Sequence, residues 1–462
     1  MVRVWLALGC VVAALPLVVR PEARGAKPAV AAPKKRPLVR LFVQDLATSS
    51  LRWGDVQETA EGYGLAPLQG VEGFAGLDPA RQKLVQMSQA ERMLCVGVRD
   101  EEEGAYKSGW MLVKSGVGYT DHGDHGHWSF KWKPRVVDSR LDTRQGNPAH
   151  LYLYGGKFFL ANDRLNGYTR IDPKEYLEGK KGTPRFVPGG GNHITLAVVE
   201  DRVGYGAWID GGGPNQGRVD VTPIHGKEPS AIAYSFRLPT GVIHGATANS
   251  GKVFFAPADG ICWVEADREV KLRPEAVKVH HISLGKEGDK PRRTGAFANH
   301  GPYVLCVTGK QASAALVLLD ARKSEPQPVL VPLTVAKGTQ ATTPHVAVTP
   351  AGKAYALVFH DRTKGSEAEE ALEVVDLDPN GDGDCSDARS IKRLKVGTSA
   401  VEGHFGHHDL AFDADRRHGF FSNPGDGTVS MLDLKRLEVV ATFKVGGKPT
   451  ALTVVGGQDG ED

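Results

Sequence analysis

A repeat of about fifty residues constrains the fold of this chain more than any other feature of its sequence. Each copy has a short alternating apolar stretch, a turn with Gly or Asp, and a second apolar stretch. Seven copies can be aligned, opening at Gln82, His150, His193, His244, Thr294, His345 and His408. The steps between them are 68, 43, 51, 50, 51 and 63 residues. A period near fifty built from four strands is typical of a β-propeller blade.

The repeat predicts an all-β fold, a β-propeller of seven or eight four-stranded blades, and eight is the favoured count. The copy from His408 is the most complete and contains four strands. After it, "PTALTVVGG" from Pro449 reads as the innermost strand of another blade. "VRLFVQDLATSSLRWGDV" from Val39 supplies outer strands without an inner one. We therefore expect the N- and C-terminal strands to close the ring, with the propeller over 38–458 and a tail over 459–462.

The N-terminus reads as an export signal. "MVRVWLALGCVVAALPLVV" combines one arginine with an apolar run that suits a signal peptide and is short for a membrane span. We assign residues 1–26 to the signal peptide and 27–37 to a Pro/Ala/Lys linker; a buried N-terminal strand or helix is the alternative. The protein is thus expected to be periplasmic or otherwise exported, and no later stretch is apolar enough to span a membrane.

Charge and cysteine usage exclude some classes of function. With 57 basic and 54 acidic residues, the net charge of +3 is too small to favour nucleic acid as a partner. Beyond the signal, Cys95, Cys262, Cys306 and Cys385 form no C-x-x-C pair. We expect buried thiols, with a disulfide as the alternative.

Histidine recurs at the first position of the repeat. Five of the seven openings carry it: His150, His193, His244, His345 and His408. The first strand of each blade lines the propeller channel, so equivalent positions converge on the axis. The pattern predicts a hub lined by imidazoles that can bind a metal. The alternative is a structural role, in which each histidine hydrogen-bonds the backbone of a neighbouring blade.

A glycine-laced loop concentrates metal ligands. In "TDHGDHGHW", the residues Asp121, His122, Asp124, His125 and His127 fall within seven positions. The loop accounts for the 68-residue step, which exceeds the usual spacing by about 18, so it is an insertion. Imidazole and carboxylate suit zinc, but also copper or nickel. Two or three ligands from the loop, with the rest from the hub histidines, would make a transferable site, and the sequence leaves open whether loop and hub build one site or two. A solvated polar turn is the alternative.

These motifs resemble one known family. "DHGDH", followed by "NPAHLYLYGGKFFLANDRLNG" and "GVIHGATANSGKVFFAPADGICWV", is similar to the periplasmic zinc metallochaperones of the AztD type. The resemblance implies an exported propeller that passes zinc to the solute-binding protein of a zinc ABC transporter. It also implies zinc contacts from His122, Asp124, His125, His150 and His244, with His408, beside His407, as the distal partner. The loop here departs from the family by continuing as "GHWSFKWKP".

A second candidate metal loop is "DLDPNGDGDCSD". Its spacing matches a calcium loop, with oxygen ligands at positions 1, 3, 5, 7, 9 and 12 from Asp376, Asp378, Asn380, Asp382, Asp384 and Asp387. The flanking stretches read as strands, and position 12 is Asp instead of the usual Glu. The spacing therefore predicts calcium as a second cofactor, with an ion-free acidic hairpin as the alternative.

The sequence as a whole favours a monomeric, zinc-binding metallochaperone that is not an enzyme. Zinc would be captured by neutral imidazoles and a carboxylate and released by ligand exchange through the Asp121–His127 loop. Two alternatives remain. A hub metal with a bound water could support a hydrolase or lactonase, or the propeller could be an interaction scaffold without metal.

Overall fold

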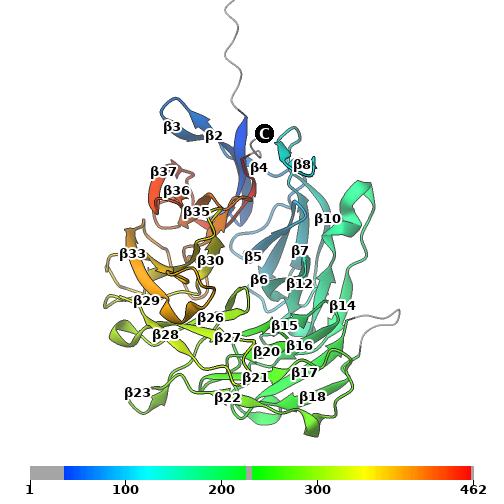
Figure 1. The fold of residues 1–462 in the computed structure, drawn as a ribbon. Coiled ribbons are helices and arrows are strands. Elements are labelled where there is room, and N and C mark those ends of the chain that lie inside the picture. Colours follow the sequence, from blue (N-terminus) through cyan, green and yellow to red (C-terminus); the bar gives the residue numbers. More distant parts are fainter. Residues whose placement is uncertain (1–35, 225–230, 459–462) are drawn as a thin grey trace, which may run out of the picture. The chain divides into compact units, whose positions relative to one another are not determined.

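The computed structural model describes residues 36–224 and 231–458 (Figure 1). Eight antiparallel blades surround a central channel, which confirms the predicted all-β propeller and its favoured blade count. The predicted signal peptide and nearly all of the linker lie outside the described residues, as does the predicted tail. Strands run from Pro37 to Gly456. No described helix is long and apolar enough to cross a membrane.

Among the first four blades, blade 1 combines strands from both ends of the chain, and blades 2 to 4 follow in sequence order. They are β1 (Pro37–Asp45), β2 (Ser50–Thr59), β3 (Gly62–Leu65) and β38 (Pro449–Gly456) in blade 1; β5 (Gln82–Ala90), β6 (Met93–Asp100), β7 (Ser108–Lys114) and β10 (Arg135–Asp142) in blade 2; β11 (Pro148–Tyr154), β12 (Lys157–Asn162), β13 (Gly167–Ile171) and β14 (Arg185–Pro188) in blade 3; and β15 (Thr195–Val199), β16 (Val203–Ala207), β17 (Arg218–Pro223) and β18 (Tyr234–Arg237) in blade 4.

The other four blades follow in sequence order. They are β19 (Ala246–Asn249), β20 (Lys252–Phe255), β21 (Ile261–Glu265) and β22 (His280–Ile282) in blade 5; β25 (Ala298–His300), β26 (Tyr303–Thr308), β27 (Ala315–Asp320) and β28 (Val329–Pro332) in blade 6; β29 (Thr339–Ala341), β30 (His345–Val348), β31 (Ala354–Arg362), β32 (Ala371–Asp376) and β33 (Arg389–Lys395) in blade 7; and β34 (Leu410–Phe412), β35 (His418–Asn423), β36 (Thr428–Asp433) and β37 (Glu438–Lys444) in blade 8.

A few short elements lie outside this pattern. Strand β4 (Gln69–Gly70) pairs with β2, while β8 (Gly118–Asp121) with β9 (Gly126–Ser129) and β23 (Lys286–Glu287) with β24 (Lys290–Pro291) form separate hairpins. The described helical elements are all 3₁₀ turns: η1 (Asp163–Leu165), η2 (Pro173–Gly179), η3 (Gly213–Asn215), η4 (Pro274–Ala276), η5 (Gln311–Ser313) and η6 (Cys385–Asp387).

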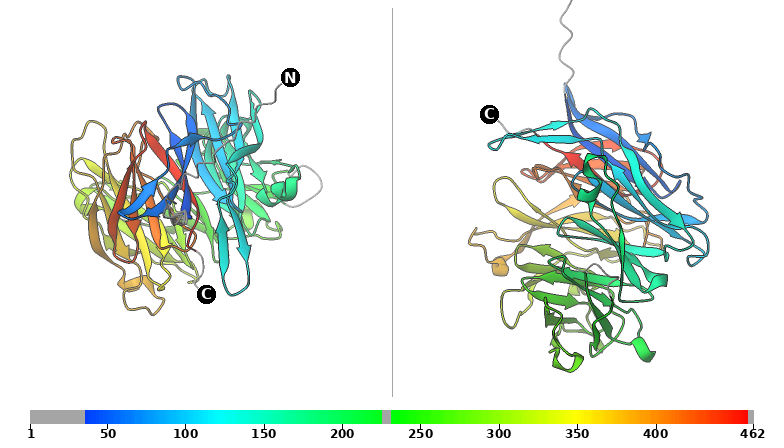
Figure 2. Two further views of the ribbon diagram at one scale, coloured as in Figure 1. Left: turned by 90° about the horizontal axis from the view of Figure 1, so that it is seen from above. Right: turned by 90° about the vertical axis from the view of Figure 1, so that its right-hand side faces the viewer.

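The ring closes through blade 1, as the sequence predicts. Strand β38 from the C-terminus pairs antiparallel with β1 from the N-terminus, from Val39 opposite Gly456 to Asp45 opposite Pro449. These strands, red and blue in Figure 2, lie side by side. Strand β38 also contacts β34 of blade 8 and β5 of blade 2. The last strand of the chain is therefore the innermost strand of blade 1.

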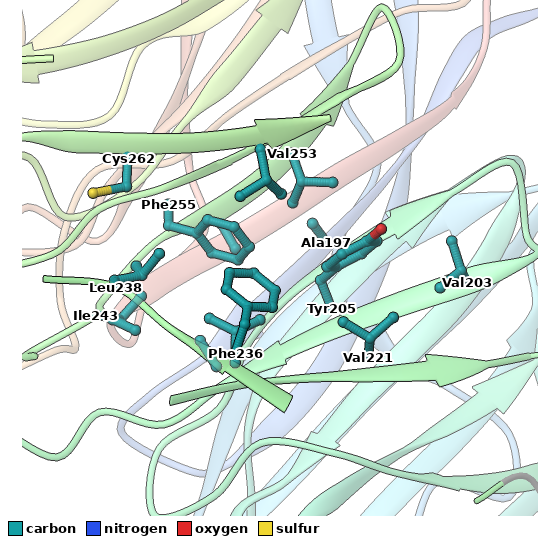
Figure 3. Close-up of a cluster of buried hydrophobic side chains, with 14 of the residues drawn as sticks. Ala197, Val203, Tyr205, Val221, Phe236, Leu238, Ile243, Val253, Phe255 and Cys262 are labelled. Carbon is teal, nitrogen blue, oxygen red and sulfur yellow. The ribbon is translucent and has the colours of Figure 1, made fainter. Parts of the chain in front are cut away.

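The hydrophobic core is divided among the interfaces between blades. Eight buried clusters each combine apolar side chains from two neighbouring blades, one cluster for each interface of the ring. Between blades 4 and 5, the ring of Phe236 lies edge-on to that of Phe255, with centroids 6.2 Å apart (Figure 3). Because alternate side chains of a strand face opposite sides, each blade contributes to two interfaces.

The cysteines belong to this core. Cys95, Cys262, Cys306 and Cys385 are buried and free, so the expectation of buried thiols is confirmed. Burial raises the pKa of all four thiols, to about 12 for Cys262 and Cys306. They therefore act as apolar packing groups.

Candidate metal centre

Four histidines meet in the channel and form what we call the imidazole cluster: His150, His193, His244 and His404. His150 lies in β11, while His193 and His244 each precede the inner strand of their blade by two residues. His404 comes from the segment between β33 and β34. Ring centroids are 4.5 Å apart for His150 and His193, 5.2 Å for His193 and His244, and 6.0 Å for His244 and His404. Three neighbouring blades and one long connection thus bring four imidazoles together.

Two of these imidazoles are held through Nδ1. The Nδ1 of His193 lies 3.3 Å from a carboxylate oxygen of the buried Asp163, and the Nδ1 of His244 lies 3.1 Å from the carbonyl oxygen of Gly295. Both partners are acceptors, so the imidazoles donate from Nδ1 and each Nε2 keeps its lone pair. A carboxylate or carbonyl on the outer nitrogen is the usual support of a metal-ligating histidine.

The inner nitrogens are close enough to share a metal. The Nε2 atoms of His150 and His193 lie 2.8 Å apart. Two nitrogens on one tetrahedral zinc, each about 2.0–2.1 Å from it, are about 3.3 Å apart. A small separation of the two rings would therefore admit the ion.

Burial favours the neutral form of three of the imidazoles, those of His150, His244 and His404. Loss of hydration lowers the pKa of His150 far below its ordinary value, and the neighbouring imidazoles lower it further. Partial loss of hydration likewise lowers the pKa of His244 and of His404, although His404 is the most exposed of the four. Since only the neutral ring offers a lone pair, the cluster is prepared for metal at neutral pH.

A second group in the channel is organised by a buried carboxylate. The two oxygens of Asp361 each lie 2.7 Å from an Nδ1 atom, one of His407 and one of His408. Although burial raises the pKa of Asp361, the hydrogen bonds from both imidazoles bring it below its ordinary value. The Nε2 of His408 faces the carbonyl oxygen of Gly397 at 3.2 Å. Both nitrogens of His408 thus have partners, and the structure does not place it in the imidazole cluster.

The tightest ligand-like group belongs to this second region. Among the residues that the structure describes, Asp361, Glu370 and His408 form the one group of such ligand atoms that all lie within 4.8 Å of one another. Glu370, however, accepts from the backbone N–H groups of Arg362 at 2.7 Å and Ser399 at 2.8 Å. Each of these three side chains therefore has hydrogen-bond partners within the protein, and we assign this group of Asp361, Glu370 and His408 a structural role.

His345 opens β30 as predicted but lies away from the imidazole cluster. Its Nε2 is 4.0 Å from a carboxylate oxygen of Asp409. Together with His244, His407 and His408 it lines a channel cavity of about 590 Å³. The cavity links the imidazole cluster to the Asp361 group.

The predicted loop forms the tip of the β8–β9 hairpin. The rings of His122, His125 and His127 lie with centroids 5.0 to 5.3 Å apart. The Nδ1 of His125 lies 2.8 Å from a carboxylate oxygen of Asp124, and an oxygen of Asp121 accepts from the N–H of Gly123. The loop therefore gathers its imidazoles as the sequence suggests, although most of its side chains are exposed.

The hairpin and the imidazole cluster lie at opposite ends of the blades. The start of β11 is fixed by Asn147, which accepts from the N–H of Asp100 and donates its own N–H to the hydroxyl of Ser108, the first residue of β7. The hairpin follows Lys114, at the other end of β7. Seven residues of strand span about 20 Å. The structure thus places the loop and the hub apart, as two separate groups of candidate ligands.

The Asp-rich segment connects β32 to β33. Asp376 ends β32, and one of its oxygens lies 3.7 Å from the ammonium of Lys353. The carboxylate of Asp378 accepts from the N–H groups of Gly381, Asp382 and Gly383. Asn380, Asp384 and Asp387 complete the loop, and calcium there stays a prediction.

Sequence reasoning missed two parts of the centre. His404 is absent from the aligned openings, yet "EGHFGHH" has the same interleaving of Gly and His as the hairpin loop, which is a usable signal. Asp163 gave no signal, because it lies 30 positions from His193 in the chain and meets it only when the chain folds back.

Fold and site together define a β-propeller with an imidazole-lined hub. No family model matches the chain. AztD of Citrobacter koseri is similar in structure, with a TM-score of 0.61 and 16% identity over 92% of this chain and 99% of that one; its apo structure gives the same values. The dihydro-heme d1 dehydrogenase NirN in complex with DHE has a TM-score of 0.52 and 13% identity over 91% of this chain and 76% of that one. At such identities the likeness shows the propeller fold alone.

Proposed function

We propose that this protein is an exported zinc-binding metallochaperone that holds zinc at the imidazole cluster. The observation that carries the proposal is the convergence of His150, His193, His244 and His404, with Asp163 and the Gly295 carbonyl holding two of the rings. Four imidazoles can fill a tetrahedral zinc shell without a water. Such a closed shell suits storage and delivery better than catalysis.

The rest of the proposal concerns delivery. The fold shared with AztD and the motifs at 121–127, 147–150 and 241–244 support a solute-binding protein of a zinc ABC transporter as the acceptor. The signal peptide predicted from the sequence supports a periplasmic or otherwise exported location, and the chain is proposed to act as a monomer and not as an enzyme. The hairpin histidines, His122, His125 and His127, are proposed as the outer ligands from which zinc exchanges.

The first test is zinc analysis of purified, tag-free protein. We compare the wild type with a hub variant, His193→Ala/His244→Ala, and a matched hairpin variant, His122→Ala/His125→Ala. We expect about one tightly held zinc in the wild type and in the hairpin variant, and none in the hub variant. Circular dichroism melting verifies that each variant is folded. Wild-type protein without zinc after growth in zinc-rich medium would contradict the proposal.

The delivery step has its own test. Zinc-loaded protein is mixed with the metal-free solute-binding protein in the presence of a chelator that captures released zinc. Transfer that outruns the chelator supports direct handover, and the hairpin variant should slow it. If the chelator captures the zinc before it reaches the solute-binding protein, the protein stores zinc but does not deliver it directly.

One observation favours the alternative of a metal-dependent hydrolase. Both His244 and His407 line the cavity of about 590 Å³. The Nδ1 of His407 lies 2.7 Å from a carboxylate oxygen of Asp361, and a carboxylate in this position can orient an imidazole that acts as a general base beside a metal. Assays of the zinc-loaded protein on lactones and phosphoesters distinguish the two, and we expect no turnover.

A further inference from the structure

A cavity of about 560 Å³ lies at the base of the β8–β9 hairpin, at the end of blade 2 opposite the imidazole cluster. Its lining contains four cations and two aromatic side chains, which we call the cationic pocket: Arg92, Lys114, Lys133, Arg135, Tyr119 and Trp132. Its residues come from β7, from the turn before β6 and from the inserted segment up to β10 (Figure 1). Nothing in the zinc site uses this surface.

The cations of the pocket have no acidic partners. None of Arg92, Lys114, Lys133 and Arg135 makes a side-chain hydrogen bond or ion pair with any residue that the structure describes. Of the two acids in the lining, Glu91 is paired with Lys174, at 3.4 Å, so Glu72 alone opposes them. An almost balanced chain, with a net charge of +3, therefore concentrates positive charge in one concave place.

The aromatic side chains add apolar surface to this charge. Trp132 is 63% exposed and Tyr119 is 40% exposed, and both are among the most exposed large apolar side chains described. Tryptophan, tyrosine and arginine are the residues most enriched where protein partners bind. If the four cations served only to keep this surface hydrated, an exposed tryptophan beside them would have no role.

The pocket is built on a rigid base. The buried guanidinium of Arg40 donates to the carbonyl oxygens of Ser115, at 2.9 Å, and Trp132, at 2.6 Å, and so ties the two ends of the insertion together. Arg40 itself is fixed by a bidentate pair with Asp55, at 2.7 and 2.9 Å. A surface held in place before binding loses less entropy when a partner docks.

We propose that the cationic pocket docks an acidic segment of a partner protein, whose carboxylates meet the four cations while an apolar side chain packs on Trp132. A recessed pocket containing Glu72 suits a peptide segment better than a flat anionic bilayer, which favours protruding basic residues. The proposal goes beyond metal binding, because the pocket and the imidazole cluster lie at opposite ends of blade 2.

The probe is a fluorescein-labelled eight-residue peptide with five carboxylates and one phenylalanine, followed by fluorescence anisotropy. We expect the wild type to bind it and Lys133→Glu/Arg135→Glu to bind about tenfold more weakly or worse. Trp132→Ala should weaken binding about three- to tenfold. Lys286→Glu/Lys290→Glu, the same charge change on the exposed β23–β24 hairpin, is the matched control and should bind like the wild type. A peptide with Gln and Asn for the acids should not bind.

Several results would overturn the proposal. The first is equal binding by the wild type and by Lys133→Glu/Arg135→Glu. The second is sedimentation with phosphatidylglycerol vesicles without any peptide binding, which would assign the surface to a membrane. The third is peptide binding that appears only after removal of residues 459–462, which carry acids of their own. Zinc content measured on each variant separates this test from the proposed function, because a failed pocket leaves bound zinc unchanged.

Discussion

The imidazole cluster and the hairpin tip use the same residue types in opposite ways. In the cluster, rings from different blades meet in the channel, and burial lowers the pKa of three of them. At the tip, His122, His125 and His127 are crowded by their sequence spacing alone, on a single turn where His122 and His127 are exposed and His125 is half-buried. The cluster has an outer support for two of its rings, whereas at the tip the Nδ1 of His125 lies 2.8 Å from a carboxylate oxygen of the exposed Asp124.

This difference shows that metal ligands close together in the sequence are not necessarily held in a fixed arrangement by the fold. The hairpin turn does need its glycines, because Gly123 has a φ of 95° and the backbone of Gly126 packs against the Tyr119 ring. Those glycines shape the turn, but the ligands remain in water. The hub histidines lose more conformational freedom when the chain folds than the hairpin histidines do. Their nitrogens therefore need less rearrangement when a metal binds.

The largest effect is expected at the fourth cluster position. His404→Ala should weaken zinc binding about 100-fold, since one of four ligands is lost. His408→Ala is the control: zinc affinity should stay within about threefold. The free energy of unfolding should fall by about 3 kcal/mol, because the buried Asp361 loses a partner. Competition with a chromophoric chelator and denaturant melts measure both. The reverse pattern would make His408 the distal ligand, as the sequence suggested.

A smaller effect is expected from the outer support. Asp163→Asn keeps the size of the side chain but removes the charge that faces the Nδ1 of His193. Zinc affinity should fall about tenfold, within the range typical of such supports. Asp124→Asn, the equivalent change at the hairpin, should leave hub affinity unchanged. Equal losses for the two variants would remove the distinction between the two regions.

The smallest effect is expected from pH. Because burial lowers the pKa of His150, His244 and His404, protons begin to compete with zinc only below the ordinary pKa of 6.5. Zinc affinity should therefore be close to its maximum above pH 6.5 and should decline as the pH falls through the lowered pKa values of these histidines. Between pH 7.5 and 6.5 we expect less than about a threefold change, whereas four imidazoles of ordinary pKa would lose about tenfold. A tenfold loss measured by competition titration would show that the cluster titrates as in water.

The fold was predictable because its signal is repeated. Alternation of apolar residues, turns rich in glycine and a period near fifty all recur, so one misread strand does not change the architecture. Even ring closure could be read, because "PTALTVVGG" lacks outer strands and the segment from Val39 lacks an inner one. β38 and β1 pair accordingly.

The candidate site was predictable in part, for a related reason. His150, His193 and His244 occupy a repeat position, and equivalent positions converge in a propeller. His404 lies in a connection outside the repeat, and Asp163 reaches His193 from another blade, so neither follows from spacing. The separation of hub and hairpin depends on which end of β7 carries the insertion, which strand register decides.

The sequence by itself thus determined the propeller, a count of seven or eight blades with eight favoured, the closure of the ring and the supply of imidazoles to the channel. Local pattern and repetition carry that information. The tertiary structure alone decided that His404 joins the cluster, that His408 is held by Asp361 and Gly397, and that the cationic pocket forms around Trp132. These features depend on contacts between residues far apart in the chain, whose distances no single stretch of sequence encodes.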